Sequence, residues 1–556
     1  MKRRFGLKMV LLFGLMLIAA GCNFSGSEDT GTQDSGSDQS DQSSSDDADN
    51  NQNESVINLT ANADIPTLDS ALAHDSIGFT VLNNIMEGLY RSDENHQPQL
   101  ALAEDHQVSD DGLVHTFILR DAVWSNGDPV TAEDFEYAWK RVFEKAGSYN
   151  VMFETVGVKN ASAILAGEKT PDELGVESLD EKTLQVTLEH PSPLFKQLLT
   201  FPTFFPVNQS YVEEMGEDYA LEADNLVFNG PFVLADWKHD QGWTYKKNPD
   251  YWDQESVQMD QINVEVVKET STAVNLYETE AVDRILLSSA YVENYKDSED
   301  FISELRPGIV FMRFSHKDEF ANPNIRRAIS LAIDKKGLTS VILADGSRPL
   351  NGLVPYEFSY SPDGQDFREL NGEFNVHDVD QAQEFWQKGL DELGIDGFDM
   401  ELTAADNDYH VKTAEYIKDQ LEKNLPGIGV DIKLVPFSNR LELEKAIEYD
   451  MVISTWGPDY NDPMTYVDMW VTDGPANRME YSNPAFDEMV KQAYAETDAA
   501  ARYELMLEAE RVLLEEDFAI VPLYQNADAI LMRPHIKGMI RHPSAPEFDY
   551  KHAYIE

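Results

Sequence analysis

The sequence predicts an α/β protein with at least two lobes, and three observations support this prediction. The chain has 556 residues, more than a single hydrophobic core normally serves, and 42% of them are hydrophobic. Strand-like runs at 398–404, 429–436 and 450–456 alternate with helical patterns at 409–424 and 439–449. This β-α-β-α-β order predicts a parallel sheet with right-handed crossovers. Ligands of such sheets bind beyond the carboxyl ends of the strands, where the sequence reads Trp456 to Pro463.

The charge balance of the chain excludes one class of partner. Asp and Glu number 101 against 43 Lys and Arg, which gives a formal net charge of −58. A chain with this charge repels the phosphates of nucleic acid, so we exclude a nucleic-acid partner. We interpret the excess as a solvated acidic surface, and because it is spread over the whole chain it identifies no ligand.

The first 21 residues have the order of a secretory signal peptide, with a basic start and an apolar run from Met9 to Ala20. Ala19-Ala20-Gly21-Cys22 resembles a bacterial lipobox, which implies lipidation of Cys22 and anchoring to the outer face of the cell membrane. The alternative, a transmembrane anchor, is disfavoured because the apolar run is short for a membrane span. Residues 22–55 consist mainly of Ser, Asp, Gly, Gln and Asn, which predicts a disordered acidic tether.

Several further elements are predicted from local patterns. Alternating apolar residues indicate strands at 56–60, 113–120 and 184–188. Thr131 with an acid three residues later predicts a helix start, and Asn322-Pro323 predicts another. Asp406-Asn407-Asp408 superficially matches a metal-binding loop but lacks the downstream spacing of a calcium hand, so we interpret it as a helix cap.

Recognisable catalytic motifs are missing from the sequence. We find no Gly-x-Ser-x-Gly elbow, no phosphate-binding loop and no His-Glu-x-x-His zinc pair. Cys22 is the only cysteine, and its place at the cleavage site indicates an anchor, so a catalytic thiol is not expected. We therefore expect a binding protein without a cofactor or a metal, and keep a lipid-anchored hydrolase as an alternative.

With these segments in place, the chain resembles the oligopeptide-binding lipoproteins of ABC importers, within family 5 of the extracellular solute-binding proteins. The similarity extends from about Val56 to the C-terminus. It rests on many short motifs in the family's order: Met86 to Tyr90, Thr116 to Arg120, Trp124 to Gly127, Thr131 to Phe135, Asn229 to Phe232, Asn248 to Trp252, Arg326 to Asp334 and Trp456 to Pro463.

The resemblance implies a two-lobed periplasmic-binding-protein-like fold of the class II, or cluster C, type with an extra inserted domain. On that pattern, domain I comprises 56–90, 206–306 and 526–556, domain II comprises 91–205, and domain III, the second lobe, comprises 307–525. Domains I and III close on the ligand about hinge strands near 306 and 525. The implied molecule is a monomer.

The resemblance also implies the ligand contacts. Asp459 matches the family's carboxylate for a peptide ammonium, although it could instead cap the turn before Pro463. Trp456 and Gly457 flank the ligand backbone in the same motif. Further implied contacts, on shorter or weaker matches, are Tyr149, Tyr524, Ser288 and Ser289, the last two standing where relatives carry asparagines. No residue can be matched to the peptide carboxylate; Arg478 and Lys412 are only guesses.

The predicted function is to capture oligopeptides outside the cell and deliver them to the membrane permease of an ABC importer. Two alternatives stay open within the same fold. One is a receptor for another solute, such as a nickel chelate, an oligosaccharide or a small antibiotic, and the other is a sensor of peptide pheromones. Fold alone does not separate them.

Overall fold

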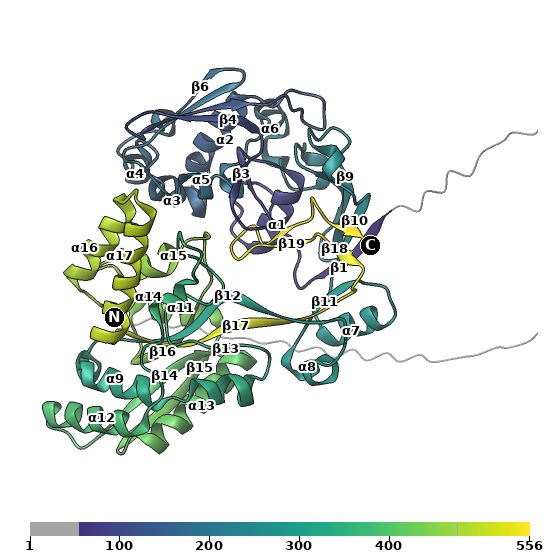
Figure 1. Cartoon of the computed structure of the whole chain (residues 1–556). Coiled ribbons are helices and arrows are strands. Elements are labelled where there is room, and N and C mark those ends of the chain that lie inside the picture. Colours follow the sequence, from purple (N-terminus) through teal and green to yellow (C-terminus); the bar gives the residue numbers. More distant parts are fainter. Residues whose placement is uncertain (1–54, 475) are drawn as a thin grey trace, which may run out of the picture. The chain divides into compact units, whose positions relative to one another are not determined.

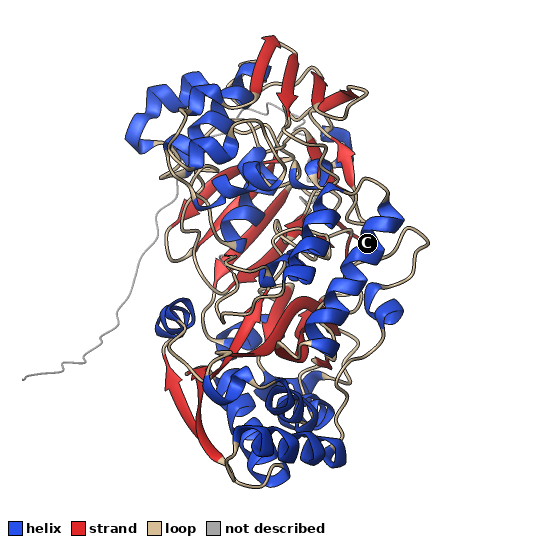
Figure 2. Ribbon diagram, turned by 90° about the vertical axis from the view of Figure 1, so that its left-hand side faces the viewer, coloured by secondary structure: helices blue, strands red, loops and turns tan. Residues whose placement is uncertain are grey.

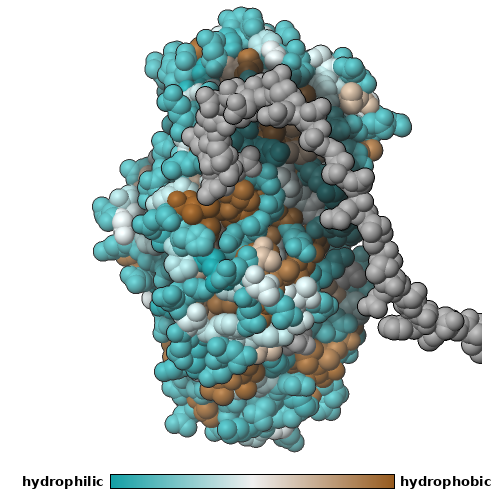
Figure 3. All heavy atoms as spheres, turned by 90° about the vertical axis from the view of Figure 1, so that its right-hand side faces the viewer, coloured by the Kyte–Doolittle hydropathy of each residue, from teal (hydrophilic) through white to brown (hydrophobic). Residues whose placement is uncertain are grey.

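The computed structural model describes residues 55–474 and 476–556. The predicted signal peptide, the predicted lipidation site Cys22 and all but the last residue of the predicted tether lie outside these residues. No helix in the described part is both long and apolar enough to cross a membrane. Figure 3 shows one face of the molecule, where hydrophilic side chains predominate and apolar patches are scattered between them.

An eleven-stranded mixed sheet forms the centre of the fold (Figures 1 and 2). Ten strands follow one another across it, and β13 (Arg348–Pro349) pairs with β17 beside this path. In spatial order they are β15 (Ile428–Val435), β14 (Phe398–Ala405), β16 (Met451–Trp456), β12 (Phe301–Phe314), β17 (Ile520–Met532), β11 (Arg284–Leu287), β1 (Val56–Ala61), β10 (Gln261–Val266), β9 (Gly242–Lys247) and β8 (Phe232–Lys238).

The predicted β-α-β-α-β unit is confirmed within one or two residues at most element ends. Strand β14 is followed by α13 (Asp408–Asn424), β15, α14 (Phe437–Ala446) and β16. Both neighbours of β14 run parallel to it. Asn407 caps α13 by accepting a hydrogen bond from the His410 backbone N–H at 3.0 Å, as the helix-cap interpretation predicted. Trp456 ends β16, so the loop 457–463 follows the carboxyl end of a parallel strand.

The second half of the long strand β12, residues 309–314, is buried on both faces. Ile309 and Phe311 belong to one hydrophobic core, whereas Val310, Met312 and Phe314 belong to another. Successive side chains of a strand point to opposite faces, so this one strand joins the two cores. Helices α9 (Pro323–Ala332), α12 (Val379–Leu393) and α13 cover the second core. A third, smaller core lies between β11 and the helices α7 (Thr270–Glu278) and α8 (Ser289–Tyr295).

Strands β12 and β17 pair antiparallel, but their register is interrupted in the middle. Pairing stops at Leu305, resumes at Ile309, and shifts once more between Val310 and Phe311. Pro307 has no backbone N–H to donate, so it cannot continue the ladder. The interruption places Arg306, Pro307 and Gly308 at the wall of a cavity.

A separate four-stranded sheet, which is antiparallel throughout, lies beside α2 (Ala132–Glu144). Thr131 and Asp134 form the predicted capping box, in which Thr131 Oγ1 accepts from the Asp134 N–H at 3.3 Å and Asp134 accepts from the Thr131 N–H at 3.0 Å. Trp139 on the buried face of α2 is fully enclosed. The strands, in spatial order, are β4 (Ala103–Val108), β5 (Val114–Leu119), β7 (Thr183–Thr187) and β6 (Val176–Asp180).

Shorter elements and the remaining helices complete the chain. They are α1 (Ser76–Ile85), β2 (Tyr90–Ser92), β3 (Pro98–Leu100), α3 (Val151–Thr155), α4 (Ala161–Leu165), α5 (Phe195–Leu198), α6 (Gln209–Met215), α10 (Lys335–Gly337), α11 (Phe367–Asn371), α15 (Met464–Val467), α16 (Pro484–Ala495), α17 (Ala499–Arg511), β18 (Ile536–Lys537), β19 (Ile540–Arg541), β20 (Phe548–Asp549) and β21 (Tyr554–Ile555).

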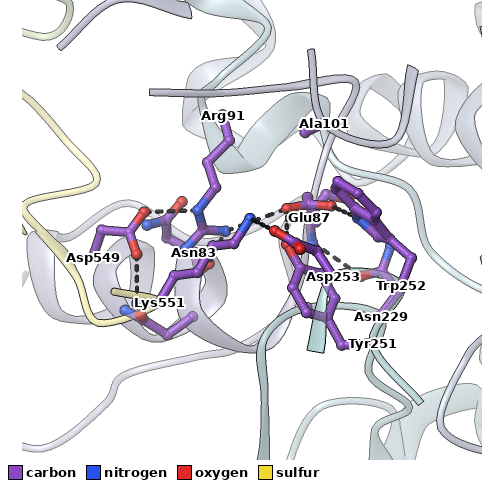
Figure 4. A network of polar contacts seen from close by, with 12 residues as sticks. Asn83, Glu87, Arg91, Ala101, Asn229, Tyr251, Trp252, Asp253, Asp549 and Lys551 are labelled. Atoms are coloured by element: carbon purple, nitrogen blue, oxygen red, sulfur yellow. Dashed lines mark hydrogen bonds and ion pairs between the residues drawn. The ribbon is translucent and has the colours of Figure 1, made fainter. Parts of the chain in front are cut away.

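The motifs quoted for the resemblance build a buried polar network (Figure 4). Glu87 accepts hydrogen bonds from the Tyr251 hydroxyl and the Trp252 indole, each at 2.5 Å. The side chain of Asn229 bonds both backbone groups of Glu87, at 3.0 and 3.1 Å. These residues come from three separate motifs, which the fold brings into direct contact. Their shared task is to hold this part of the scaffold.

The same network fixes the C-terminal segment of the chain (Figure 4). Arg91 Nε lies 2.7 Å from Asp549 Oδ2, and its Nη1 donates to the Asn83 carbonyl at 2.9 Å. Lys551 Nζ lies 2.7 Å from Asp253 Oδ2. Burial by itself would raise the pKa of Asp549, but the charge and hydrogen bond of Arg91 outweigh it and lower that pKa to about 2.

Candidate functional site

A cavity of about 580 Å³ lies where β1, β11, β12 and β17 meet the loop that follows β16. Its size falls within the usual range for a small-molecule site. The walls come from distant parts of the sequence, including the loop and helix start 74–80, Tyr149, the bulge 306–308, the loop 457–459 and the C-terminal segment 539–550. The position agrees with the prediction that a ligand site lies beyond the carboxyl end of this strand.

Asp459 lines the cavity and carries an uncompensated negative charge. Its backbone N–H donates to Thr465 Oγ1 at 3.1 Å, which fixes the loop, while no described residue donates to its carboxylate. Burial raises the pKa of Asp459 to about 6, with no cation nearby to offset the effect. Above that pH the cavity therefore holds a desolvated anion that needs a cationic partner.

The neighbouring Asp462 shows what a structural aspartate looks like in the same motif. Its carboxylate accepts two hydrogen bonds from Arg502, at 2.7 and 2.8 Å, and one from the Met464 N–H at 2.9 Å. Asp462 is therefore the turn-capping acid that directly precedes Pro463, a role that was the alternative for Asp459. The two carboxylates of one motif have separate tasks, and only Asp459 faces the cavity.

Tyr149 lines the cavity close to Asp459. Its ring packs against Phe79 and Phe201, with ring centroids 5.1 and 5.0 Å away. Burial, followed by the charges of Asp459 and Asp75, raises the pKa of Tyr149, so its hydroxyl keeps its proton. Gly147 allows this placement, because a Cβ there would lie 1.8 Å from the Ala71 carbonyl oxygen.

Trp456 and Gly457 differ in their relation to the cavity. Gly457 is exposed and lines it, and a Cβ added at this position would meet no atom within 4 Å. Trp456 is half-buried and packs against the main core, with its indole donating to the Thr465 carbonyl at 3.0 Å. Trp456 therefore holds the loop in place and does not line the cavity.

The structure does not bring the other expected residues to the Asp459 cavity. Tyr524 is 1% exposed and lies in the second core, with its hydroxyl 3.4 Å from Thr413 Oγ1. Strand β17 reaches the cavity only further along, at Asn526 and Asp528. Ser288 lines an adjoining pocket of about 270 Å³, and Ser289 begins α8 beside it. Arg478 pairs with Glu444 at 3.8 Å, and neither Arg478 nor Lys412 lines the cavity.

Several cavity residues could not be found from the sequence. They belong to segments outside the motifs that the sequence offered. Asp75 caps α1 by accepting from two backbone N–H groups and also faces the cavity. The others include Arg284, Arg306, Asn526, Asp528, Arg541 and Phe548. In the described residues no group of three or more His, Cys, Asp or Glu side chains could hold a metal ion.

Comparison with known proteins agrees with this architecture. The sequence model of the bacterial extracellular solute-binding proteins, family 5 Middle, matches residues 97–478. The chain belongs to this family. The dipeptide-binding protein DppE of Bacillus subtilis is 32% identical, over 88% of this chain and 90% of its own length. The resemblance drawn from the sequence motifs is therefore confirmed.

Two solved structures are similar to this solute-binding protein over most of its length. The substrate-binding domain of an oligopeptide ABC transporter from Bacillus anthracis is 44% identical, with a TM-score of 0.75 over 90% of this chain and 99% of that one. Listeria monocytogenes OppA bound to peptide is 43% identical, with the same TM-score and coverage. These matches confirm the predicted two-lobed α/β fold, and the family places the protein outside the cytoplasm.

Proposed function

We propose that this solute-binding protein captures short peptides and delivers them to the permease of an ABC importer. The observation that carries the proposal is the unpaired carboxylate of Asp459, which is desolvated and faces the cavity. A free peptide supplies an ammonium group for it, and a charge-assisted hydrogen bond in an enclosed site is stronger than one in water. A neutral sugar would leave this carboxylate without a partner.

The surroundings of Asp459 support the same ligand. The Tyr149 hydroxyl stays protonated beside it and can bond the ammonium group or the first peptide unit. Gly457 leaves open space, so a ligand backbone can approach the loop closely. Contacts to the backbone and the N-terminus are shared by all peptides, so they give affinity without reading sequence.

The expected domains I, II and III remain our proposal for how the chain divides. Strands β12 and β17 connect the two proposed lobes, and the interrupted register at 306–308 supplies an irregular point about which they can rotate. Tyr466 donates to the Pro307 carbonyl at 2.5 Å, which links the region of Asp459 to this bulge. Closure would enclose the peptide and exclude water.

Anchoring through a lipidated Cys22 and an acidic tether, and a monomeric state, complete the proposal. The tether would hold the binding part away from the membrane surface while it reaches the permease. Permease docking and lipidation rest on the family and on the lipobox-like sequence.

The first test is mass spectrometry of the ligands released when the purified protein is denatured, where we expect a mixture of short peptides. Asp459→Asn should then weaken a peptide with a free amine by about 10- to 100-fold, because a hydrogen bond to a charged group contributes roughly 1.5–3 kcal/mol. The N-acetylated peptide should lose much less.

Asp391→Asn is the matched control, because Asp391 is an exposed aspartate on α12 of the second lobe. Equal losses for free and acetylated peptides would remove Asp459 from its assigned role. Small-angle scattering of the wild type should show a smaller radius of gyration with peptide, and an unchanged radius would contradict closure.

A further inference from the structure

Arg284, the first residue of β11, has a buried guanidinium without an acceptor. The residue is only 8% exposed and lines the same cavity as Asp459. Its guanidinium carbon lies 4.8 Å from the centre of the Phe548 ring, which holds the group by a cation–π contact. Among the described residues, no hydrogen bond or ion pair is formed by this side chain, although a guanidinium has five N–H donors.

The other two arginines of the cavity wall are engaged. Arg306 lies 3.0 Å from Asp528 and 2.5 Å from Glu547. Arg541 lies 2.7 Å from Glu304 and from Glu547, and also pairs with Asp528. Two arginines thus satisfy three acids in one network. Within the described part of the cavity wall, Arg284 is the arginine whose N–H donors have no acceptor.

Because Arg284 is buried, the lack of hydrogen-bond acceptors for its guanidinium has an energetic cost. A buried charged group without partners loses the hydration that it had in water, and this loss is recovered only when an acceptor is supplied. Elsewhere in the chain, unpartnered guanidinium nitrogens of Arg313 and Arg440 are sealed from any ligand. The nitrogens of Arg284 are not sealed, because the residue lines the cavity.

The two unpaired charges of the cavity wall, Asp459 and Arg284, do not neutralise each other. Arg284 acts on the pKa values of Glu304 and Asp528 but is absent from the causes that set the pKa of Asp459. The cavity therefore has an acidic end at Asp459 and a basic position at Arg284, on opposite lobes of the proposed domain division.

We propose that Arg284 binds a carboxylate of the ligand, so that the cavity selects peptides carrying both a free amine and a correctly spaced acid. This inference rests on the proposed peptide-binding function and adds the group that the motifs did not supply. The carboxylate comes either from the peptide C-terminus or from an acidic side chain. A guanidinium suits both, because its planar donors match a carboxylate with two parallel hydrogen bonds.

A competing role for Arg284 is purely structural. The network of Arg306, Arg541 and three acids has one more negative than positive charge, and Arg284 could serve only as its distant counter-charge. In that case its loss would weaken the fold and all ligands alike. A ligand contact, by contrast, affects only ligands that carry the acid.

The test is a calorimetric comparison of wild type, Arg284→Met and Arg284→Lys. The probes are alanine peptides of two to five residues, each as the free acid and as the C-terminal amide, together with amides ending in Glu or in Gln. Arg284→Met keeps apolar contact with Phe548 while removing the donors. Arg348→Met is the control, because Arg348 also lies over an aromatic ring, 3.4 Å from the Tyr356 ring centre, but does not line the cavity.

We expect Arg284→Met to weaken the best free-acid peptide by about 10- to 100-fold and its amide by less than about threefold. Arg284→Lys should recover part of the loss. Loss for the free acids identifies the C-terminus as the source, whereas selective loss for the amide ending in Glu over that ending in Gln identifies a side chain. Equal losses for all peptides, or no loss for any, would overturn the assignment to Arg284.

The failure of this inference is distinguishable from failure of the proposed function. If the wild type binds none of these peptides and releases none on denaturation, peptide capture itself fails. If Asp459→Asn discriminates free from acetylated amines while Arg284→Met treats acid and amide alike, only the role of Arg284 fails.

Discussion

Asp549, which is fully buried, and Asp459, which is half-buried at the cavity wall, are two aspartates whose pKa values move in opposite directions. Asp549 has a cation beside it, Arg91 at 2.7 Å, and burial is outweighed so that its pKa falls to about 2. Asp459 has no cation partner among the described residues, and burial raises its pKa to about 6. The surroundings differ in one essential respect, which is whether the fold supplies the counter-charge.

This difference separates the scaffold from the site. The network around Glu87 and Arg91 provides partners for most of its polar groups from within the chain, so it stabilises this part of the scaffold. The cavity leaves Asp459 and Arg284 without partners, which costs stability until a ligand arrives. Binding sites commonly keep perturbed charges of this kind for their ligands.

Breaking the ion pair between Arg91 and Asp549 should have the largest effect on stability. Arg91→Met leaves Asp549 buried without its cation, so we expect the free energy of unfolding at pH 7.5 to fall by roughly 3–5 kcal/mol in urea titrations. Arg511→Met is the control, because Arg511 is 44% exposed and pairs with Glu508 at 3.2 Å on the surface of α17. The control should lose less than about 1 kcal/mol. Similar losses for both variants would refute the contrast.

Removing the charge of Asp459 should raise the free energy of unfolding, whereas Arg91→Met should lower it. The folded pKa of Asp459 lies above its ordinary value of 3.8, so the ionised form costs stability as the pH rises from about 4 to about 6. Asp459→Asn should therefore stabilise the ligand-free protein at pH 7.5, by of the order of 1–3 kcal/mol, while weakening peptide binding.

The pH dependence sharpens this comparison. The stability gained by Asp459→Asn should shrink toward zero as the pH falls from about 6 to about 4, where the wild-type carboxyl becomes neutral. Asp549→Asn should instead be destabilised at pH 7.5, and its deficit should shrink between about pH 4 and pH 2 as wild-type Asp549 takes up a proton. Thermal unfolding of both variants across this range checks the signs, and trends in the same direction would contradict them.

The smallest expected effects come from replacing two glycines, one in the cavity wall and one that contacts the backbone of another segment. Gly457→Ala should leave the free energy of unfolding within about 0.5 kcal/mol, because the added Cβ meets nothing in the ligand-free cavity. It should nevertheless weaken peptides about tenfold if a backbone passes this point. Gly147→Ala should lower stability by roughly 1–3 kcal/mol, because its Cβ meets the Ala71 carbonyl. Unchanged affinity in Gly457→Ala would place the ligand elsewhere.

Much of the fold could be predicted from the sequence because the signals are local. The alternation of Val430, Ile432 and Leu434 and the caps at Thr131 and Asn322 each act over a few residues, and the structure confirms the elements they predicted. The site was only partly predictable. The motif at 456–463 placed Asp459 beside the cavity, but Trp456 and Tyr524 turned out to face the cores, because burial on a strand depends on its neighbours in the sheet.

The sequence by itself determined the α/β class, the β-α-β-α-β unit and the motifs of family 5, because periodicity, capping and motif residues are properties of short segments. Only the tertiary structure decided which charges are paired. Asp462 and Asp459 lie three residues apart, yet one meets Arg502 and the other faces the cavity, and Arg284 lies in no motif at all. Whether a charge is satisfied depends on residues far away in the sequence, 40 positions for Asp462 and Arg502 and 458 for Arg91 and Asp549, and folding alone brings those residues together.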